Sequence, residues 1–319
     1  MKDLSIVIVS FRGWSRLIKC LESLEAFTGN VIKTEVIVVD NKSEDTTILN
    51  IEERFPEFRF VHNTVNGGYA NGCNLGAKNA AGEFILFLNP DTMVLETEVE
   101  KILIVARQNP EFGIVSCRQV TEKGRECLVC GAFPSFLNLT GLLRAIFPPG
   151  APRIGTHTPE ISFPDWVSGS VIMIRNETFK KVGGFDEDFW MYFEDVDFCR
   201  RIRDAGLEIA YCRNITIEHN HGGSSRIDLK TTSLTKTEVH ISQHMYISKH
   251  TAGYENFFIQ TFLVLNKLIS GSLMAVAGLM LFFIPKILSR TLVYFRLIWY
   301  YIGSLIRLTW ISRRSVNFR

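Results

Sequence analysis

The stretch Phe84-Ile85-Leu86-Phe87-Leu88-Asn89-Pro90-Asp91 decides the fold class of this chain. Five apolar residues in a row predict a buried strand, and the sequence turns polar as soon as that strand ends. Similar short apolar runs precede it, at residues 4–10, 35–39 and 58–62. Helical patterns lie between the runs, at residues 14–24, 44–54 and 69–80. Strands joined by helices of this length predict an α/β domain with a mostly parallel central sheet flanked by helices.

The polar segments that follow the strands are the places where a ligand is expected. In open α/β sheets, ligands bind outside the carboxyl ends of the strands. Four such segments occur here, at residues 10–13, 40–43, 63–68 and 89–91. Farther along we expect a helix at 96–108, a strand at 113–117, an irregular stretch from about 118 to 165, a strand at 167–174 and a helix at 193–205.

The last part of the chain differs in composition from the rest. Residues 256–319 contain no Asp or Glu and eight Lys or Arg residues, whereas residues 1–255 carry 27 basic and 33 acidic residues. Leu268–Ile284 is uncharged over 17 residues, the lower limit for a spanning helix, and residues 286–311 have an amphipathic pattern rich in aromatic residues and arginine. We therefore divide the chain into a domain at 1–250 and a membrane-associated helical tail at 251–319.

Two questions about this tail stay open at the level of sequence. It either spans the membrane or lies on its surface, with aromatic side chains at headgroup depth and cations toward anionic lipid. The alternative is a helical hairpin that packs against the rest of the chain or against a partner protein.

Cysteine usage and the N-terminal sequence indicate a reducing compartment. The seven cysteines form no repeating framework, and the first ten residues lack the layout of a signal peptide. Cys127 and Cys130 form a Cys-x-x-Cys pair without a second pair at matching spacing, so ordinary thiols are favoured over a zinc site.

Carboxylates at two places have the pattern of catalytic or metal-binding groups. Asp91 directly follows a strand, where it can bind Mg²⁺ or Mn²⁺, although an Asp there is more often a turn or cap residue. Glu194, Asp195 and Asp197 enter the predicted helix at 193–205, and adjacent carboxylates can raise one another's pKa and supply a general base. Acidic residues at a helix start, followed by three arginines, equally fit helix-dipole stabilisation, so both interpretations stay open.

Two further segments are candidates for binding phosphate or metal. His219 and His221 precede a Gly-Gly-Ser-Ser turn, and one imidazole can bind either ligand, although a loop His commonly has neither role. Asn66-Gly67-Gly68 precedes a helix and can turn backbone N–H groups toward a phosphate. The chain has no Walker P-loop and no Gly-x-Gly-x-x-Gly opening a helix after its first strand, which disfavours the common ATP and NAD folds.

Together these segments resemble the family 2 glycosyltransferases, which have the GT-A fold. Within that family the chain is most similar to the bacterial rhamnosyltransferase-like branch, which builds cell-surface polysaccharide such as O-antigen. The resemblance covers residues 3–226 in the family's order, and the set of segments is specific although each is weak alone. The matching segments are residues 5–11, 36–43, 66–74, 88–91, 166–170, 183–189 and 192–197, followed by His219 with its Gly-Gly-Ser-Ser turn.

The resemblance implies a role for each matching residue. Asp91 is the metal-binding aspartate of the family's Asp-x-Asp element, whose first position is Asn89 here, so the metal has one carboxylate fewer at that point. His219 helps to hold Mg²⁺ or Mn²⁺ or the diphosphate. Asp195 is the catalytic base, and Glu194 supports it or contacts the acceptor. The acceptor and sugar pocket contains Trp166 and Gly169. The nucleotide-sugar pocket contains Ser10, Asp40, Asn66, Gly68, Asn74 and Asn89, with Asp40 contacting the nucleobase.

The resemblance also implies a mechanism and partners. Transfer is a single in-line displacement with inversion, and the absence of the Gln-x-x-Arg-Trp element of processive members predicts transfer of one or a few sugars. The favoured donor is dTDP-rhamnose, with UDP-sugars or GDP-sugars as alternatives, and the acceptor is a glycan linked to a polyprenyl diphosphate. No nucleic acid is expected. A membrane-bound acceptor and an apolar tail imply a location at the cytoplasmic face of the inner membrane.

Two other functions fit parts of the sequence. A non-catalytic sugar-nucleotide or glycan-binding subunit of a membrane glycan synthase has the same fold, and Asn89 in place of an acid is its support. A nucleotidyltransferase that makes the activated sugar needs a Gly-rich, basic loop after the first strand, of which residues 11–14 are a poor version. Nucleotide binding without sugar release favours the first alternative, and reaction with nucleoside triphosphates favours the second.

Overall fold

The computed structural model describes residues 2–27, 32–136, 139, 160–220, 228–281 and 283–318. The chain forms two compact units. We name as the sheet unit residues 1–133, 150–186 and 194–224, and as the helical unit residues 134–149, 187–193 and 225–319.

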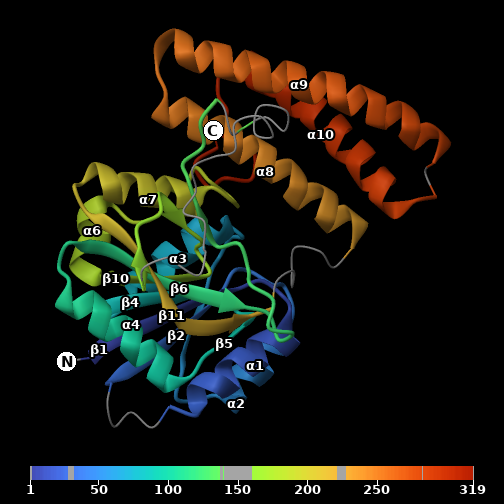
Figure 1. Cartoon of the computed structure of the whole chain (residues 1–319). Coiled ribbons are helices and arrows are strands. Elements are labelled where there is room, and N and C mark those ends of the chain that lie inside the picture. Colours follow the sequence, from blue (N-terminus) through green and yellow to red (C-terminus); the bar gives the residue numbers. More distant parts are fainter. Residues whose placement is uncertain are drawn as a thin grey trace. The chain divides into compact units, whose positions relative to one another are not determined.

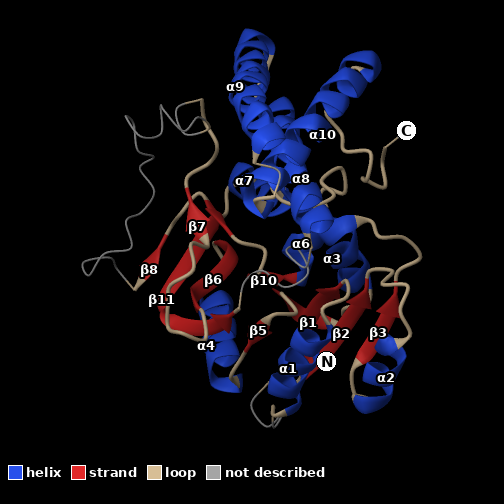
Figure 2. Cartoon of the chain, turned by 90° about the vertical axis from the view of Figure 1, so that its right-hand side faces the viewer, coloured by secondary structure: helices blue, strands red, loops and turns tan. Residues whose placement is uncertain are grey.

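The sheet unit is built around one mixed sheet, which Figure 1 and Figure 2 show from two sides. Its strand order is β3-β2-β1-β4-β10-β6-β11-β5, β8 pairs with β11, and β7 and β9 form a separate pair. The strands are β1 Lys2–Ser10, β2 Thr34–Asp40, β3 Arg59–His62, β4 Gly82–Leu88, β5 Thr92–Met93, β6 Phe112–Val120, β7 Cys130–Gly131, β8 Ile161–Ser162, β9 Trp166–Val167, β10 Val171–Arg175 and β11 Glu208–His219.

Helices cover both faces of the sheet because side chains alternate along each strand. On β1, Leu4, Ile6 and Ile8 point into one apolar core, and Val7 and Val9 point into the other. The first core is closed by α1, α2 and α4 and the second by α3, α6 and α7, on opposite sides of the sheet in Figure 1. These helices are α1 Trp14–Glu25, α2 Thr47–Arg54, α3 Gly68–Lys78, α4 Glu96–Gln108, α6 Asn176–Val182 and α7 Glu194–Asp204.

The strand directions agree in part with the predicted, mostly parallel sheet. β1, β2, β3 and β4 are parallel to one another, as predicted, but β10 runs antiparallel between β4 and β6. β5 and β8 are antiparallel to β11 as well, so the sheet is mixed. β6 and β11 run parallel to each other and in the same direction as β4, so most of the longer strands follow the prediction. The antiparallel strands were not predicted, because apolar patterning indicates whether a strand is buried and not which way it runs.

Three predicted elements also have different boundaries. The strand expected at 167–174 is two strands, because a turn at residues 168–170 separates β9 from β10. The helix expected at 44–54 begins only at Thr47. The stretch from 118 to 165 is partly regular, since β6 continues to Val120 and both β7 and β8 lie within it; residues 140–159 are outside the described residues.

The helical unit consists mainly of three helices, α8 Leu229–His250, α9 Gly253–Met280 and α10 Pro285–Arg307. Pro285 occupies the first turn of α10, where its missing N–H costs no helical hydrogen bond. α10 packs against both α8 and α9. In the part of the chain that the structure describes, no helix is both long enough and apolar enough to cross a membrane. The division at residue 250 and the membrane association of the tail stay predictions.

Candidate active site

The candidate site lies at the carboxyl edge of the parallel strands, where several of the predicted residues gather. β1 ends at Ser10 directly opposite Asp40, the last residue of β2. Ser10 is buried, and its carbonyl oxygen accepts a hydrogen bond from Asn41 N at 2.8 Å. The ends of the first two strands are thereby fixed side by side.

Asp40 is held in place by the loop that follows it. Its carboxylate accepts hydrogen bonds from the backbone N–H and the hydroxyl of Ser43, and Ser43 Oγ accepts one from Arg12 N at 3.0 Å. Three residues of these two loops have left-handed backbone conformations, with φ of 57° at Arg12, 60° at Lys42 and 57° at Glu44. Such strain in non-glycine residues is concentrated at functional sites, because the surrounding structure must enforce it.

Asn66 and Gly68 belong to a network of asparagine amides that shapes the loop before α3. Asn41 Nδ2 donates to Asn66 Oδ1 at 3.2 Å and to Gly68 O at 3.0 Å, and Asn63 Nδ2 donates to Asn41 Oδ1 at 2.9 Å. Gly68 has φ of 85°, which a side chain would strain. Sequence reasoning missed the structural part that Asn41 and Asn63 take here, because it depends on contacts between separate loops.

Asn74, predicted to bind the nucleotide sugar, holds the backbone of a distant segment. Its Nδ2 donates to Phe185 O at 2.8 Å, and its Oδ1 accepts from Phe185 N at 2.9 Å. These paired bonds fix α3 to the segment between α6 and α7. A Cβ added at Gly184 would lie 2.7 Å from Asn74 Oδ1, so a glycine is needed beside this contact.

We expect Asn74→Ala to destabilise the protein by about 2 kcal/mol, because it removes both hydrogen bonds and leaves a buried N–H and C=O without partners. Urea unfolding measures this change. Asn109→Ala is the control, since the Asn109 side chain bonds, among the contacts described, only a carbonyl of the adjoining helix α4, Val105 O at 2.8 Å. Unchanged stability together with weakened nucleotide binding would instead assign Asn74 to ligand contact.

Asp91 and His219 meet at the same edge of the sheet. β5 and β11 are antiparallel with Thr92 opposite His219, and this pairing places His219 Nε2 3.2 Å from Asp91 Oδ1. The other ring nitrogen, Nδ1, lies 2.7 Å from Gln119 Oε1. Because that oxygen only accepts, Nδ1 carries a proton. Nε2 faces Asp91, to which it donates when it is also protonated and beside which it can bind a cation when it is not.

This pair fits a divalent cation. An unprotonated ring nitrogen and a carboxylate oxygen are both ligands for Mn²⁺ or Mg²⁺, and the contact of Nδ1 with Gln119 Oε1 leaves Nε2 as the nitrogen that faces such an ion. Adjacent ligands of an octahedral ion at about 2.1 Å lie about 3 Å apart, close to the separation seen here. No group of three or more such side chains occurs among the described residues, so the remaining positions would be filled by water and substrate oxygens.

Asp195 is positioned by the turn between β9 and β10. Its Oδ2 accepts from Gly169 N at 2.9 Å and its Oδ1 from Val196 N at 2.8 Å. Tyr69 OH donates to Gly169 O at 2.6 Å, so the same turn is held from α3. A Cβ at Gly169 would lie 3.1 Å from the Tyr69 ring and 3.5 Å from Asp195 Cβ, so only glycine brings the turn this close without a shift.

The same turn connects Asp195 to the Asp91–His219 pair. Ser170 Oγ donates to Gln119 Oε1 at 2.8 Å, and Gln119 contacts His219. Gln119 and Ser170 are fully buried. A continuous series of polar contacts therefore runs from Asp195 through the turn to His219 and Asp91.

Glu194 and Asp195 have raised pKa values because burial removes water from their carboxyl groups, and for Glu194 the nearby charge of Asp195 adds to this effect. Glu194 Oε2 is buried without a hydrogen-bond partner among the described residues, which is uncommon for a structural group. Asp197 faces Arg201 instead, whose Nε donates to Asp197 Oδ2 at 2.8 Å. The three carboxylates thus divide into an ion pair at Asp197 and two buried groups, Glu194 and Asp195, whose pKa values are raised.

Trp166 and Asn89 take part in the site through contacts that the sequence did not predict. The indole N–H of Trp166 donates to Ala132 O at 2.9 Å, which adds a side-chain hydrogen bond between β9 and the residue after β7. The backbone of Asn89 connects β4 to the turn, since Asn89 N donates to Ser170 O at 3.0 Å.

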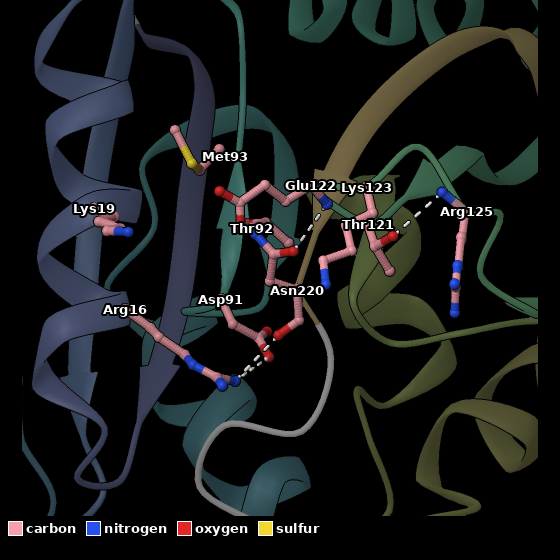
Figure 3. A pocket seen from close by; sticks show the side chains of 10 residues that line it. All are labelled: Arg16, Lys19, Asp91, Thr92, Met93, Thr121, Glu122, Lys123, Arg125 and Asn220. Carbon is pink, nitrogen blue, oxygen red and sulfur yellow. Dashed lines mark hydrogen bonds and ion pairs between the residues drawn. The ribbon is translucent and has the colours of Figure 1, made fainter.

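A cavity of about 630 Å³ opens beside Asp91 (Figure 3). Figure 3 shows the Arg16 side chain pointing from α1 toward Asp91 and Asn220. Arg16 Nη1 lies 3.6 Å from Asp91 Oδ2 and donates to Asn220 O at 3.1 Å. The wall carries more cations than carboxylates and suits an anionic group; its charged residues are Arg16, Lys19, Asp91, Glu122, Lys123 and Arg125.

Sequence comparison with protein families matches two parts of the chain. Residues 5–129 match the family described as Glycosyl transferase family 2, and residues 157–221 match the family described as N-terminal domain of galactosyltransferase. The two matches together contain the Asp40 and Asp91 segments and the Asp195 and His219 segments.

Several characterised proteins resemble the chain over most of its length. It is 28% identical to an N-acetylglucosaminyl-diphospho-decaprenol L-rhamnosyltransferase of Mycobacterium tuberculosis over 244 residues, 70% of this chain and 78% of that protein. It is 25% identical to the low-salt glycan biosynthesis hexosyltransferase Agl10 of Haloferax volcanii, covering 69% and 68% of the two chains. It is 26% identical to the rhamnosyltransferase WbbL of Escherichia coli, covering 65% and 79%.

The fold also has a counterpart among solved structures. A crystal structure of GalNAc-T7 with UDP, GalNAc and Mn²⁺ superimposes with a TM-score of 0.54 at 15% identity, over 77% of this chain and 50% of that one. At this level of identity the similarity establishes the GT-A-like arrangement of sheet and helices alone.

Proposed function

Because the chain is a family 2 glycosyltransferase with a GT-A-like fold, we propose that it transfers a single sugar, with inversion, from a nucleoside-diphosphate sugar to a lipid-linked glycan. The relatives indicate a glycosyltransferase of polysaccharide or O-antigen synthesis. dTDP-rhamnose is the favoured donor, since several relatives are rhamnosyltransferases, with UDP-sugars or GDP-sugars as alternatives. The acceptor is a glycan on a polyprenyl diphosphate, as the name of the mycobacterial relative states for that enzyme.

One observation carries this proposal. Asp195 is fixed by Gly169 N at 2.9 Å on a turn whose next residue, Ser170, bonds the glutamine that orients His219 toward Asp91. The proposed proton acceptor and the proposed cation site are therefore linked through one turn. A binding protein needs no such link between a buried carboxylate and a possible cation site, whereas a displacement at a sugar carbon makes use of both.

The proposed reaction is one displacement. Asp195 accepts the proton of the acceptor hydroxyl as that oxygen bonds to the anomeric carbon, and the bond from that carbon to the diphosphate oxygen breaks. The nucleoside diphosphate leaves with the bonding electron pair. Glu194 contacts the acceptor or supports Asp195, while Trp166 and Gly169 border the sugar.

Asp91 and His219 would hold Mg²⁺ or Mn²⁺, which when bound offsets the charge of the leaving diphosphate. Asn89 contributes no charge to this site, so the protein supplies a single carboxylate there. We expect the ion to bind mainly together with the nucleotide, because the diphosphate provides the oxygen ligands and negative charge that the protein lacks.

Arg16 should weaken metal binding in the absence of nucleotide, since its guanidinium lies 3.6 Å from Asp91 Oδ2. We expect Arg16→Gln to tighten Mn²⁺ binding about tenfold, the effect of removing a unit charge about 6 Å from a divalent ion in a water-like dielectric. Electron paramagnetic resonance of free Mn²⁺ measures this without nucleotide or turnover.

The control for this experiment is Lys19→Gln, one turn farther along α1 in the wall of the same cavity. A smaller change in Mn²⁺ affinity is expected for this variant, because Arg16 and not Lys19 contacts Asp91. Equal affinities of wild type and Arg16→Gln would show that Arg16 does not compete for Asp91.

The proposed location is the cytoplasmic face of the inner membrane. Its supports are the lipid-linked acceptor and the basic, acid-free sequence of residues 256–319. A polyprenyl-linked acceptor is confined to the bilayer, so an enzyme that uses it must act at the membrane surface.

The experiment that tests the function is a donor screen. Protein purified in detergent is incubated with Mn²⁺ or Mg²⁺, a panel of nucleotide sugars and polyprenyl-linked acceptors, and nucleoside diphosphate release is measured. Acceptor-dependent release from dTDP-rhamnose is the expected result. Tight nucleotide binding without release from any donor and acceptor pair would favour the non-catalytic subunit instead.

A further inference from the structure

Two consecutive residues directly before the carboxylates of α7 have a strained backbone. Tyr192 and Phe193 have φ of 70° and 65°, in the left-handed region that bulky side chains rarely adopt. Glu194 and Asp195 follow them immediately. Left-handed conformations of such residues cost free energy and persist only where the surrounding structure enforces them. Contacts around this pair must therefore hold it in place.

The strained pair ends a segment that belongs to the helical unit, although the chain on both sides of it belongs to the sheet unit. The chain leaves the sheet unit after Asp186 and returns to it at Glu194. We call residues 187–193 the linking segment. Within the helical unit it is contacted by α8 and by residues 308–318, which follow α10 and which we call the C-terminal stretch.

Helix α8 holds the end of the linking segment that contains the strained pair. Ser242 is buried, and its Oγ donates to Met191 O at 2.9 Å. One turn farther along α8, the Tyr246 ring lies 5.8 Å from the Phe193 ring, measured between centroids. These two contacts restrain the chain directly before and directly after Tyr192.

The C-terminal stretch holds the other end of the linking segment. It reaches a backbone carbonyl, a carboxylate and an aromatic ring, so the restraint does not depend on a single side chain. Its contacts are Ser315 Oγ donating to Glu187 O at 2.9 Å, Asn317 Nδ2 donating to Asp188 Oδ1 at 2.9 Å, and the Arg314 guanidinium 5.2 Å from the centroid of the Trp190 ring.

The backbone of the strained pair determines how α7 begins. The helix starts at Glu194, so rotation about the backbone of Phe193 turns the peptide that carries the first carboxylates. Asp195 accepts hydrogen bonds from Gly169 N and Val196 N, which suit one orientation of this first turn. Relaxation of Phe193 to an ordinary conformation would misalign Asp195, and an error of about 1 Å at a reacting group can lower a rate about 10²-fold.

We propose that the helical unit positions the proposed base through the linking segment. Ser242 and the C-terminal stretch hold this segment so that Tyr192 and Phe193 keep the left-handed conformations from which α7 starts. Ser242 is a positioning residue, since it acts on Asp195 through the backbone of residues 191–193 and contributes no group to the chemistry. The proposal rests on the proposed function, because it takes Asp195 as the base.

Ser242→Ala tests the contact between α8 and the linking segment. It removes the hydroxyl that bonds Met191 O and leaves the rest of the segment unchanged. We expect kcat to fall at least about tenfold while the affinity for nucleoside diphosphate stays the same, because the base moves and the nucleotide pocket does not. Hydrogen exchange followed by mass spectrometry should become about fivefold faster at the backbone amides of residues 191–196, as for the loss of one hydrogen bond.

The matched control is Ser233→Ala in the same helix. Ser233 is also buried, but its hydroxyl bonds, among the contacts described, a carbonyl of its own helix, Lys230 O at 2.9 Å. Both kcat and the exchange at residues 191–196 should stay at the wild-type values. Ser315→Ala is a second test variant from the C-terminal stretch, and it should change both quantities in the same direction as Ser242→Ala.

Three outcomes overturn the proposal. One is agreement of Ser242→Ala and Ser315→Ala with Ser233→Ala in both kcat and exchange. Another is faster exchange with unchanged kcat, which would show that the base does not depend on the linking segment. The third is a loss of nucleotide affinity as large as the loss of kcat. Wild-type protein that releases no nucleoside diphosphate would instead contradict the proposed function, and the exchange data would still decide whether Ser242 holds the linking segment.

Discussion

Asp195→Asn is expected to lower kcat by about 10³-fold, within the range that a general base contributes. The substitution keeps the size and shape of the side chain but removes its ability to accept a proton. The amide oxygen can still accept from Gly169 N at 2.9 Å, so the turn between β9 and β10 should keep its position, while the hydrogen bond from Val196 N to the other oxygen is lost. The loss should therefore fall on kcat, with little change in donor affinity.

Nucleoside diphosphate release with the preferred donor and acceptor measures this loss, and isothermal titration with the nucleoside diphosphate measures affinity. Asp204→Asn is the matched control at the other end of α7, where Asp204 pairs with Arg200 at the surface. Its kcat should stay within about twofold, as for an exposed ion pair. Activity of Asp195→Asn near the wild-type level would remove Asp195 as the base and leave the family assignment unaffected.

The pH dependence follows from the same group. A base acts in its deprotonated form, and burial raises the pKa of Asp195 above the ordinary value of 3.8. Activity should therefore fall on the acid side at a higher pH than an exposed aspartate would give. Because Glu194 adjoins Asp195 and its pKa is raised as well, the acid limb belongs to the pair, and Glu194→Gln should shift it to lower pH.

The sequence predicted the sheet unit well where burial alone determines the structure. β1 and β4 are strings of apolar residues with both faces covered, which is a pattern that few other environments produce. The antiparallel course of β10 was not predictable in the same way. Ser168, Gly169 and Ser170 interrupt the apolar residues there and are a turn signal, but the direction of β10 is set by its pairing between β4 and β6, which lie far away in the sequence.

The site shows the same division between local and long-range information. Asp91, Asp195 and His219 each occur in a recognisable segment, and the structure brings Asp91 and His219 within 3.2 Å. Gln119 was missed although it joins them, because its partner lies 100 residues away. The signal in the sequence was an amide near the end of a largely apolar strand. A buried amide needs a hydrogen-bond partner, but the sequence does not show which residue that is.

Asp91→Ala is expected to lower kcat/KM by about 10³-fold, or about 4 kcal/mol of transition-state stabilisation, and to abolish stimulation by Mn²⁺. The reason is that Asn89 occupies the position where the family has a second acidic residue. Asp91 is therefore the one carboxylate that faces His219. His219 alone, held by Gln119, would leave the ion with one protein ligand. Steady-state assays over a Mn²⁺ titration measure both effects, with thermal unfolding as a check that the variant is folded.

Asn89→Asp is a second variant that tests the same proposed cation site. It adds a carboxylate beside Asp91 without removing any group, and Asn89 is anchored through its backbone, since its N–H donates to Ser170 O at 3.0 Å. If the ion binds at this edge, the added charge should lower the Mn²⁺ concentration needed for half-maximal activity, opposite in direction to Asp91→Ala. If Mn²⁺ still stimulates Asp91→Ala, and if Asn89→Asp does not change the Mn²⁺ concentration needed, the cation binds elsewhere. The Asp91–His219 contact would then be a structural link between β5 and β11, and the charge of the leaving diphosphate would have to be offset by protein cations such as Arg16.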